Sequence, residues 1–285
     1  MTTNTKKTLD DLLTTLADQL AEPGHNLLPM LRLMGRFSKY SLANQLLIYA
    51  QRPGATKVLG FHSWRNTGYI VRKGEKGIAI YAPMQFRNDN SGPGTLANDP
   101  TDSNTRLGFR VAYLFDITQV EPLTGFDTAA STATAPITET TNMLPNVVPP
   151  APLACIESLK IFLATESINL VYAQLDPGHY GFTDGKTITC AAGLAPHIEF
   201  ATLVHETTHS LMHFDGNRPD ITTRETEAEA VTYLICEQLQ LADTHLSIAY
   251  IRSYQGTKTT LLDSLERIRA TAQRLAAILV PEGAA

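Results

Sequence analysis

Two histidines and a glutamate in the stretch "LVHETTHSLMH" have the types and spacing of a metal site. His205 and His209 are four residues apart, so on a helix they project about 40° apart on one face, about 6 Å apart along the axis. Glu206 is displaced by about 100° from His205, where a general base would stand to take a proton from water at the metal. The motif therefore predicts metal-activated water that attacks a carbonyl, with Glu206 as the catalytic base.

The third protein ligand must come from another part of the chain. His213 is on the same face, but it is about 12 Å from His205 along the axis, while two ligand nitrogens on one zinc are only about 3–3.5 Å apart. Asp215 has the position of the third ligand in a longer protease motif. In that motif a glycine makes a sharp turn, and Met212 stands in its place here.

The following segment, "RETEAEAVTYLICEQL", supplies the remaining candidates. Glu225 and Glu229 are four residues apart on one helix face, while Glu227 is turned about 200° from Glu225. We expect Glu225 to be the ligand and Glu229 to hold the free N–H of a ligand histidine, with the reverse order left open. A solvated acidic helix start is the alternative explanation of this pair. Two histidines and one glutamate favour Zn²⁺, with Mn²⁺ or Co²⁺ able to substitute.

Helices should position these side chains. The apolar residues of the motif gather on the face opposite the histidines, which predicts an amphipathic helix over 196–214. Further helices are expected over 153–167, 224–239 and 259–279, with a short extended region at 178–192. Its part "GKTITCA" could be an edge strand against which an extended peptide lies. Three residues could assist the oxyanion, and the sequence does not choose among them: Tyr233, His245 and Tyr250.

The first half of the chain has a different pattern. Helices are expected near 9–20 and 41–51, and then "KVLGFHSWRNTGYIVRKGEKGIAIYAP" alternates as strands with a turn at 73–76. A polar loop at 88–104 precedes another strand. The Thr/Ala/Pro-rich segment 125–152 is the expected linker.

These patterns predict an α+β protein of two domains. The first domain, at 1–124, is an N-terminal α/β domain. The second, at 153–285, is mainly helical and contains a small sheet. The sequence contains no apolar run of about 18 residues, so we expect no membrane span. Three widely spaced cysteines, an odd number, suit a reducing cytoplasm.

Charge divides the chain at the same place. Residues 1–123 carry a net charge of +4 and the remainder −9. The basic side chains of the first half are interleaved with aromatic ones, the combination that sequence-tolerant binding of single-stranded DNA uses. A basic surface around a core of aromatic residues is the simpler alternative. The candidate DNA contacts are Arg36, Lys39, Lys57, Trp64, Arg65, Arg72, Lys73 and Lys76.

The segment "SKYSLANQLLIYAQRPGATKVLGFHSWRNTGYIVRKGEKGIAIYAP" resembles the N-terminal domain of ArdC antirestriction proteins, shared with TraC-type primases. The later "TLVHETTHSLMH" and "ETEAEAVTYLICEQL" are similar to that family's zinc metallopeptidase domain. The resemblance implies single-stranded DNA binding in mobile-element transfer and a zincin centre of His205, Glu206, His209 and a glutamate of the following helix. Residues 210–213 read "SLMH" where the family commonly has Trp-Thr-Gly-His.

The leading hypothesis is an antirestriction protein that binds single-stranded DNA and carries a zinc metallopeptidase domain. The first alternative is a regulatory metalloprotease that cleaves a DNA-associated protein, which would add a protein substrate to the partners. The second is a DNA-binding protein whose zincin domain is purely structural.

Overall fold

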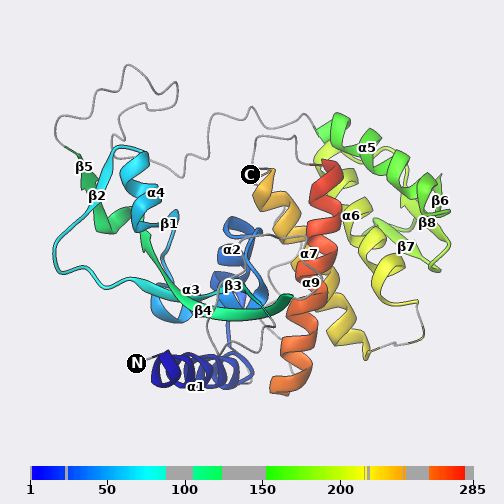
Figure 1. Ribbon diagram of the computed structural model, residues 1–285. Coiled ribbons are helices and arrows are strands. Elements are labelled where there is room, and N and C mark those ends of the chain that lie inside the picture. The colour runs from blue at the N-terminus through cyan, green and yellow to red at the C-terminus, as the bar shows by residue number, and fades with distance from the viewer. Residues whose placement is uncertain are drawn as a thin grey trace. The chain divides into compact units, whose positions relative to one another are not determined.

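The computed structural model describes residues 2–22, 25–87, 105–123, 152–214, 216, 219–239, 241 and 257–279 (Figure 1). The helices are α1 Thr2–Leu20, α2 Leu28–Arg36, α3 Leu42–Gln51, α4 Phe61–Asn66, α5 Pro152–Thr165, α6 Pro196–Met212, α7 Ile221–Gln238 and α9 Lys258–Leu279. The strands are β1 Val58–Gly60, β2 Tyr69–Val71, β3 Ile78–Arg87, β4 Thr105–Asp116, β5 Val120–Pro122, β6 Asn169–Ala173, β7 Gly181–Thr183 and β8 Thr187–Ala191, and a 3₁₀ turn η1 spans Ile117–Gln119. The predicted α+β class is confirmed.

Several sequence predictions concern residues outside the described ranges. They are the polar loop at 88–104, the linker at 125–152 apart from Pro152, the ligand candidate Asp215, and the oxyanion candidates His245 and Tyr250. Within the described ranges, none of the helices combines the length and the apolar character that crossing a bilayer requires.

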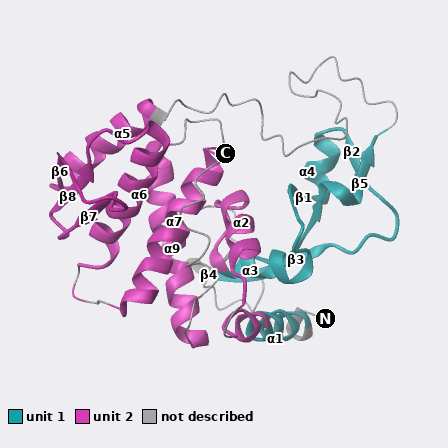
Figure 2. Ribbon diagram, turned by 180° about the vertical axis from the view of Figure 1, so that it is seen from behind, with its two compact units in different colours: residues 1–15, 43–140 teal, residues 16–42, 141–285 magenta. Residues whose placement is uncertain are grey.

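The chain forms two compact units that do not follow its linear order (Figure 2). Unit 1 contains residues 1–15 and 43–140, and unit 2 contains residues 16–42 and 141–285. Helix α2 therefore belongs with the C-terminal helices. It packs against α7, where Gly35 faces Leu234 and the Arg32 side chain donates to the Tyr233 hydroxyl at 3.2 Å.

Unit 1 is built on an antiparallel sheet with the strand order β1-β4-β3, beside a two-stranded β2–β5 pair. Leu9 of α1 and Leu47 of α3 cover the sheet by packing on Ala79 of β3. The prediction of continuous strands over 57–83 is wrong at 61–66, which form helix α4. The helix follows Gly60 and buries Trp64, so local packing of the indole overrides the strand-like alternation.

Unit 2 places a three-stranded sheet, order β6-β8-β7, beside a group of helices. Strand β8 runs parallel to β6 and antiparallel to β7, so it is the central strand, and the expectation that "GKTITCA" is an edge strand is wrong. Strand β6, whose residues are mostly exposed, is not predicted from the sequence pattern. Helix α6 packs against both β7 and β8 and against α5 and α7, while α9 packs on α7. Helix α6 is thus held from several sides, which fixes the direction of its polar face.

Candidate metal centre

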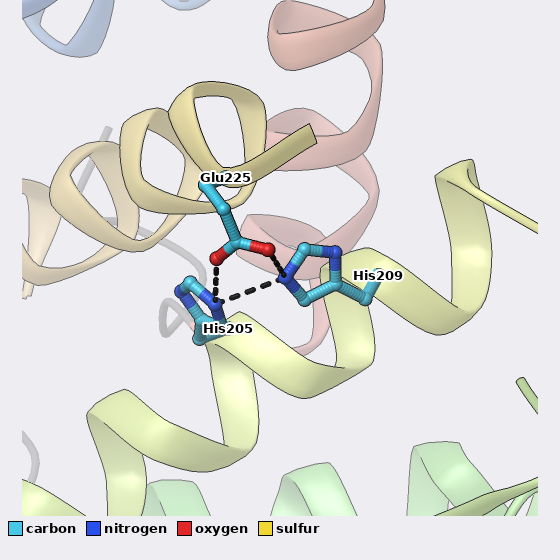
Figure 3. Close-up of side chains that lie close together, drawn as sticks. All are labelled: His205, His209 and Glu225. Atoms are coloured by element: carbon cyan, nitrogen blue, oxygen red, sulfur yellow. Dashed lines mark hydrogen bonds and ion pairs between the residues drawn. The ribbon is translucent and has the colours of Figure 1, made fainter. Parts of the chain in front are cut away.

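Helix α6 presents the two histidines of the motif to one face. Pro196 occupies its first turn, and the fully buried Phe200 and Leu203 anchor its opposite face in the core. One turn apart, His205 and His209 direct their Nε2 atoms toward each other at 3.0 Å (Figure 3). The predicted helix and the shared face of this histidine pair are confirmed.

Glu225 reaches the same point from the second turn of α7. The side chain of Asp220 caps that helix by accepting from the Thr223 N–H at 3.1 Å, which sets where the turn begins. One Glu225 oxygen lies 3.4 Å from His205 Nε2, and the other lies 3.4 Å from His209 Nε2 (Figure 3). The structure therefore brings together both histidines of the motif and the glutamate named first as the third ligand.

These separations fit a metal ion. In a tetrahedral site with bonds of about 2.0–2.1 Å, neighbouring ligand atoms are about 3.3 Å apart. The three pairs here are separated by 3.0, 3.4 and 3.4 Å. The donor set of two imidazoles and one carboxylate also suits a borderline divalent cation. The site could thus hold such an ion after only small shifts of the side chains.

Charge within the cluster keeps Glu225 ionised. The interactions of Glu225 with His205 and His209 lower the pKa of the Glu225 carboxyl well below its usual range. For His205, burial lowers the pKa, but the carboxylates around it, with Glu225 foremost, outweigh burial and raise it. The Glu225 carboxylate beside the two ring nitrogens is a donor group suited to a cation.

Glu206 stands beside the cluster in a desolvated position. Only 7% of its surface is exposed, and burial raises its pKa, against the opposing influence of His205 and His209. Strand β7 approaches closely here: a Cβ at Gly181 would lie 3.2 Å from Glu206 Cγ and 2.7 Å from Thr202 Cγ2. Gly181 is a residue that sequence reasoning missed, because nothing in the local pattern shows which strand will pack on α6.

Glu229 lies behind one of the rings. Its Oε1 is 3.6 Å from His205 Nδ1, and burial raises its pKa to about 7. Its Oε2 has no hydrogen-bond partner among the described residues. Glu225 therefore faces both Nε2 atoms, whereas Glu229 faces only the Nδ1 side of His205.

Two further residues, which helix geometry does not place at the metal, lie next to the cluster. His213 is fully buried, with its Nδ1 2.8 Å from Nδ1 of His209. Glu227, also fully buried, lies 2.9 Å from Nε2 of His213. Burial lowers the pKa of His213, which favours its neutral form. The available signal was the i, i+4 spacing of His209 and His213, which places the second ring behind the first.

The candidate DNA contacts are divided between the two units. Arg36 and Lys39 lie in unit 2, and the other six lie in unit 1. Trp64 is only 1% exposed, and its indole N–H donates to the Phe115 carbonyl at 2.7 Å. Its ring is therefore part of the core, which argues against the stacking contact that sequence suggested. Lys57, Arg65, Arg72, Lys73 and Lys76 are exposed.

The turn "KGEKG" holds its lysines at the surface by fixing its glutamate. Glu75 accepts from Arg72 at 3.0 Å and from the Gln119 side chain at 2.9 Å. Gln119 also donates to the Lys76 carbonyl at 2.8 Å. Gly74 has a φ of 91°, which glycine adopts without strain. Arg72 thus has a structural task, and Lys73 and Lys76 project from a fixed turn.

An aromatic ring lies next to this turn. Tyr113 of β4 is 53% exposed, and a Cβ added at Gly77 would lie 2.9 Å from the Cβ of Tyr113. Phe109, four residues earlier on the same face of the strand, is 59% exposed. Neither ring is predicted as a DNA contact from the sequence, because alternation alone does not tell which face of a strand the helices leave open.

Comparisons with known proteins agree with this architecture. Residues 6–113 match the family described as the N-terminal domain of anti-restriction factor ArdC. The crystal structure of the antirestriction protein ArdC from plasmid R388 in its metal-free form has 19% identity and a TM-score of 0.50, over 86% of this chain and 85% of that one. The Mn(II)-bound form has 18% identity and a TM-score of 0.52, over 96% and 98%.

A sequence relative extends the comparison. An uncharacterized protein of Bacillus anthracis is 23% identical over an alignment of 277 residues, which covers 88% of this chain and 46% of that protein. The chain thus spans about half the length of this curated relative.

Proposed function

We propose that this chain, an ArdC-type protein by its N-terminal domain and its fold, is an antirestriction protein that binds single-stranded DNA and carries a metal-dependent peptidase-type centre. In this role it protects incoming DNA of a mobile element, such as a conjugative plasmid, from host restriction in the cytoplasm. The observation that carries the proposal is the presence in one chain of the ArdC N-terminal domain and the His205–His209–Glu225 cluster.

The metal would be held by His205, His209 and Glu225, with Zn²⁺ as the proposed ion and Mn²⁺ or Co²⁺ able to replace it. The Mn(II)-bound form of R388 ArdC supports a divalent cation in this fold. When bound, the ion would supply a Lewis acid for a substrate carbonyl and lower the pKa of water. Three protein ligands leave a coordination position open, which is typical of catalytic rather than structural zinc sites.

Glu206 would be the general base of this centre. Its raised pKa favours proton uptake, and its burial beside the histidines keeps the carboxylate within their electrostatic influence. The reaction class that these residues support is hydrolysis of a peptide bond, with a protein substrate. Glu229 would act on His205 from the Nδ1 side, as a positioning residue or, in the order left open, as a ligand.

Unit 1 would provide the surface for single-stranded DNA. Lys73 and Lys76 offer cations to the phosphate backbone, and Tyr113 beside them offers a ring on which a base can stack. Lys57 and Arg65 add exposed charge in the same unit. Arg36 and Lys39 are proposed contacts of unit 2, where they follow from the sequence pattern alone.

The test is transfer of unmodified DNA into a restricting host that produces the intact protein or a variant. Loss of protection with Lys73→Ala and Lys76→Ala combined would support the DNA-binding part. Loss with Glu206→Gln, when the purified variant retains its metal, would support the peptidase part. Point variants are preferable to a truncation after residue 124, because α2 packs within unit 2 and would lose its partner. Undiminished protection by both variants would overturn the proposal.

A second candidate function is a regulatory metalloprotease that cleaves a DNA-associated protein. The buried Glu206 favours it over a purely structural metal domain, which needs no base beside the ion. Cleavage of some cellular protein should stop with Glu206→Gln while metal content stays unchanged. A structural domain would instead give equal protection with and without Glu206, and lower thermal stability once the metal is removed.

A further inference from the structure

A continuous line of buried polar contacts runs from the metal cluster to α9. His209 Nδ1 lies 2.8 Å from His213 Nδ1, and His213 Nε2 lies 2.9 Å from Glu227 Oε2. The other Glu227 oxygen accepts from the Ser264 hydroxyl at 2.5 Å and from the Arg267 guanidinium. His213 and Glu227 are both fully buried. The C-cap residue of α6, one residue of α7 and two of α9 therefore form one network that ends on a candidate metal ligand.

The chemistry of the groups fixes the direction of the hydrogen bonds. The Glu227 carboxylate accepts from Ser264 and Arg267 through one oxygen, and its other oxygen faces Nε2 of His213, so Nε2 of His213 is the donor of that bond. Two ring nitrogens 2.8 Å apart share one proton, so the His213 ring that donates from Nε2 offers Nδ1 as the acceptor for Nδ1–H of His209. With its proton on Nδ1, His209 has a free lone pair on Nε2, the atom that faces His205 and Glu225.

We propose that His213 and Glu227 are positioning residues that lock the tautomer and ring orientation of His209, and so make the affinity of the site for metal depend on α9. The proposal rests on the metal centre proposed above. It assigns a task to His213, which lies too far along α6 to share an ion with His205, and to Glu227, which faces away from Glu225. Ser264 and Arg267 complete the network by holding the Glu227 carboxylate.

The alternative is that the network only fills the core. The two readings differ in which atom of His213 matters. His213→Asn keeps an oxygen near the position of Nδ1, able to accept from His209, but loses contact with Glu227. His213→Gln places its amide near the position of Nε2, able to donate to Glu227, but offers His209 no acceptor. Both variants remove the ring, so a core-filling role predicts similar losses.

The experiment measures Zn²⁺ affinity of the full chain by competition with a chromophoric chelator. His213→Gln should weaken binding by about 10- to 100-fold, the usual effect of removing the partner of a ligand histidine, and His213→Asn should weaken it less. Thr207→Val is the matched control. Thr207 is a fully buried residue of α6 whose hydroxyl has no hydrogen-bond partner among the described residues. The Zn²⁺ affinity of Thr207→Val should therefore equal that of the wild type. Equal affinity of all four proteins would overturn the inference, as would equal losses in the Asn and Gln variants.

A second measurement remains decisive if a His213 variant does not fold. Long-range ¹H–¹⁵N correlation spectra of the metal-free wild type report which nitrogen of each histidine is protonated. The proposal expects His209 protonated at Nδ1 and His213 protonated at Nε2, and the opposite tautomer of either would overturn it. If the wild type binds no Zn²⁺, the metal centre fails. If it binds Zn²⁺ but His209 has the opposite tautomer, only the positioning role fails.

Discussion

The metal cluster of unit 2 and the basic turn of unit 1 organise polar groups in opposite ways. The His209 side chain is buried, and both of its ring nitrogens have partners at set distances: Nδ1 lies 2.8 Å from His213, and Nε2 lies 3.0 Å from His205 and 3.4 Å from Glu225 of α7. In the "KGEKG" turn the framework of Glu75 and Gln119 is fixed, while the lysine side chains extend into solvent. A buried site recognises one ion by geometry, whereas an exposed cationic surface binds a flexible polyanion by charge, which salt screens.

The largest effect should follow from removing a metal ligand. The free energy of Zn²⁺ binding in four-ligand sites is about 10–16 kcal/mol, so each ligand contributes about 3 kcal/mol on average. His205→Ala should therefore lower Zn²⁺ affinity by about 100-fold or more, as measured by chelator competition, without disturbing the His209–His213 contact. Lys186→Ala, at an exposed lysine of the same unit, is the control. If His205→Ala bound Zn²⁺ as tightly as the wild type, His205 would not be a metal ligand, and the geometry of the buried cluster would not determine metal binding.

The next effect separates core from surface within unit 1. Trp64→Phe leaves the Phe115 carbonyl without its indole donor, and an unsatisfied buried group costs about 1–3 kcal/mol. The free energy of unfolding measured in urea should fall by that amount. Affinity for single-stranded DNA, measured at a temperature where the variant is folded, should stay the same. A large loss of affinity with unchanged stability would restore Trp64 as a DNA contact.

The contrast between the regions also explains what sequence could predict. Helical periodicity placed His205 and His209 on one face and placed Glu225 and Glu229 together, because these relations lie within one helix. Helical periodicity does not predict contacts between different elements. The position of Gly181 against α6 and the pairing of Glu227 with α9 depend on packing of distant segments.

The same limit applies to the fold. Strand β3 and helices α6, α7 and α9 follow from their patterns. Helix α2 belongs to unit 2 because of tertiary contacts, such as that between Gly35 and Leu234. A local sequence pattern does not specify such contacts. Trp64 was assigned to the surface because composition cannot distinguish a buried ring from an exposed one.

A smaller effect should come from the exposed ring beside the basic turn. Stacking of one base on an aromatic side chain contributes about 1–3 kcal/mol, and a half-exposed tyrosine should lie at the low end. Tyr113→Ala should weaken binding of a fluorescent oligothymidylate by roughly fivefold in anisotropy titrations, with little change in unfolding free energy. Tyr180→Ala is the control, because Tyr180 is 40% exposed but belongs to unit 2. Equal losses from both would mean that exposed rings bind DNA without regard to the turn.

The smallest effect should be a change in the slope of log DNA affinity against log salt concentration, which measures the contribution of charge alone. Each phosphate contact on a single strand contributes about 0.7 to the fall of log affinity with log salt concentration. If Lys73 and Lys76 each neutralise one phosphate, replacing both with alanine should reduce the slope by about 1.4. The affinity loss would then shrink as salt rises, unlike the loss from Tyr113→Ala, which should be nearly constant. Zn²⁺ affinity should be unaffected by the same lysine substitutions, because the bonds in the buried cluster are far less exposed to screening. A salt slope equal to that of the wild type would place the phosphate contacts on other cations, and the exposed turn would then be a structural element only.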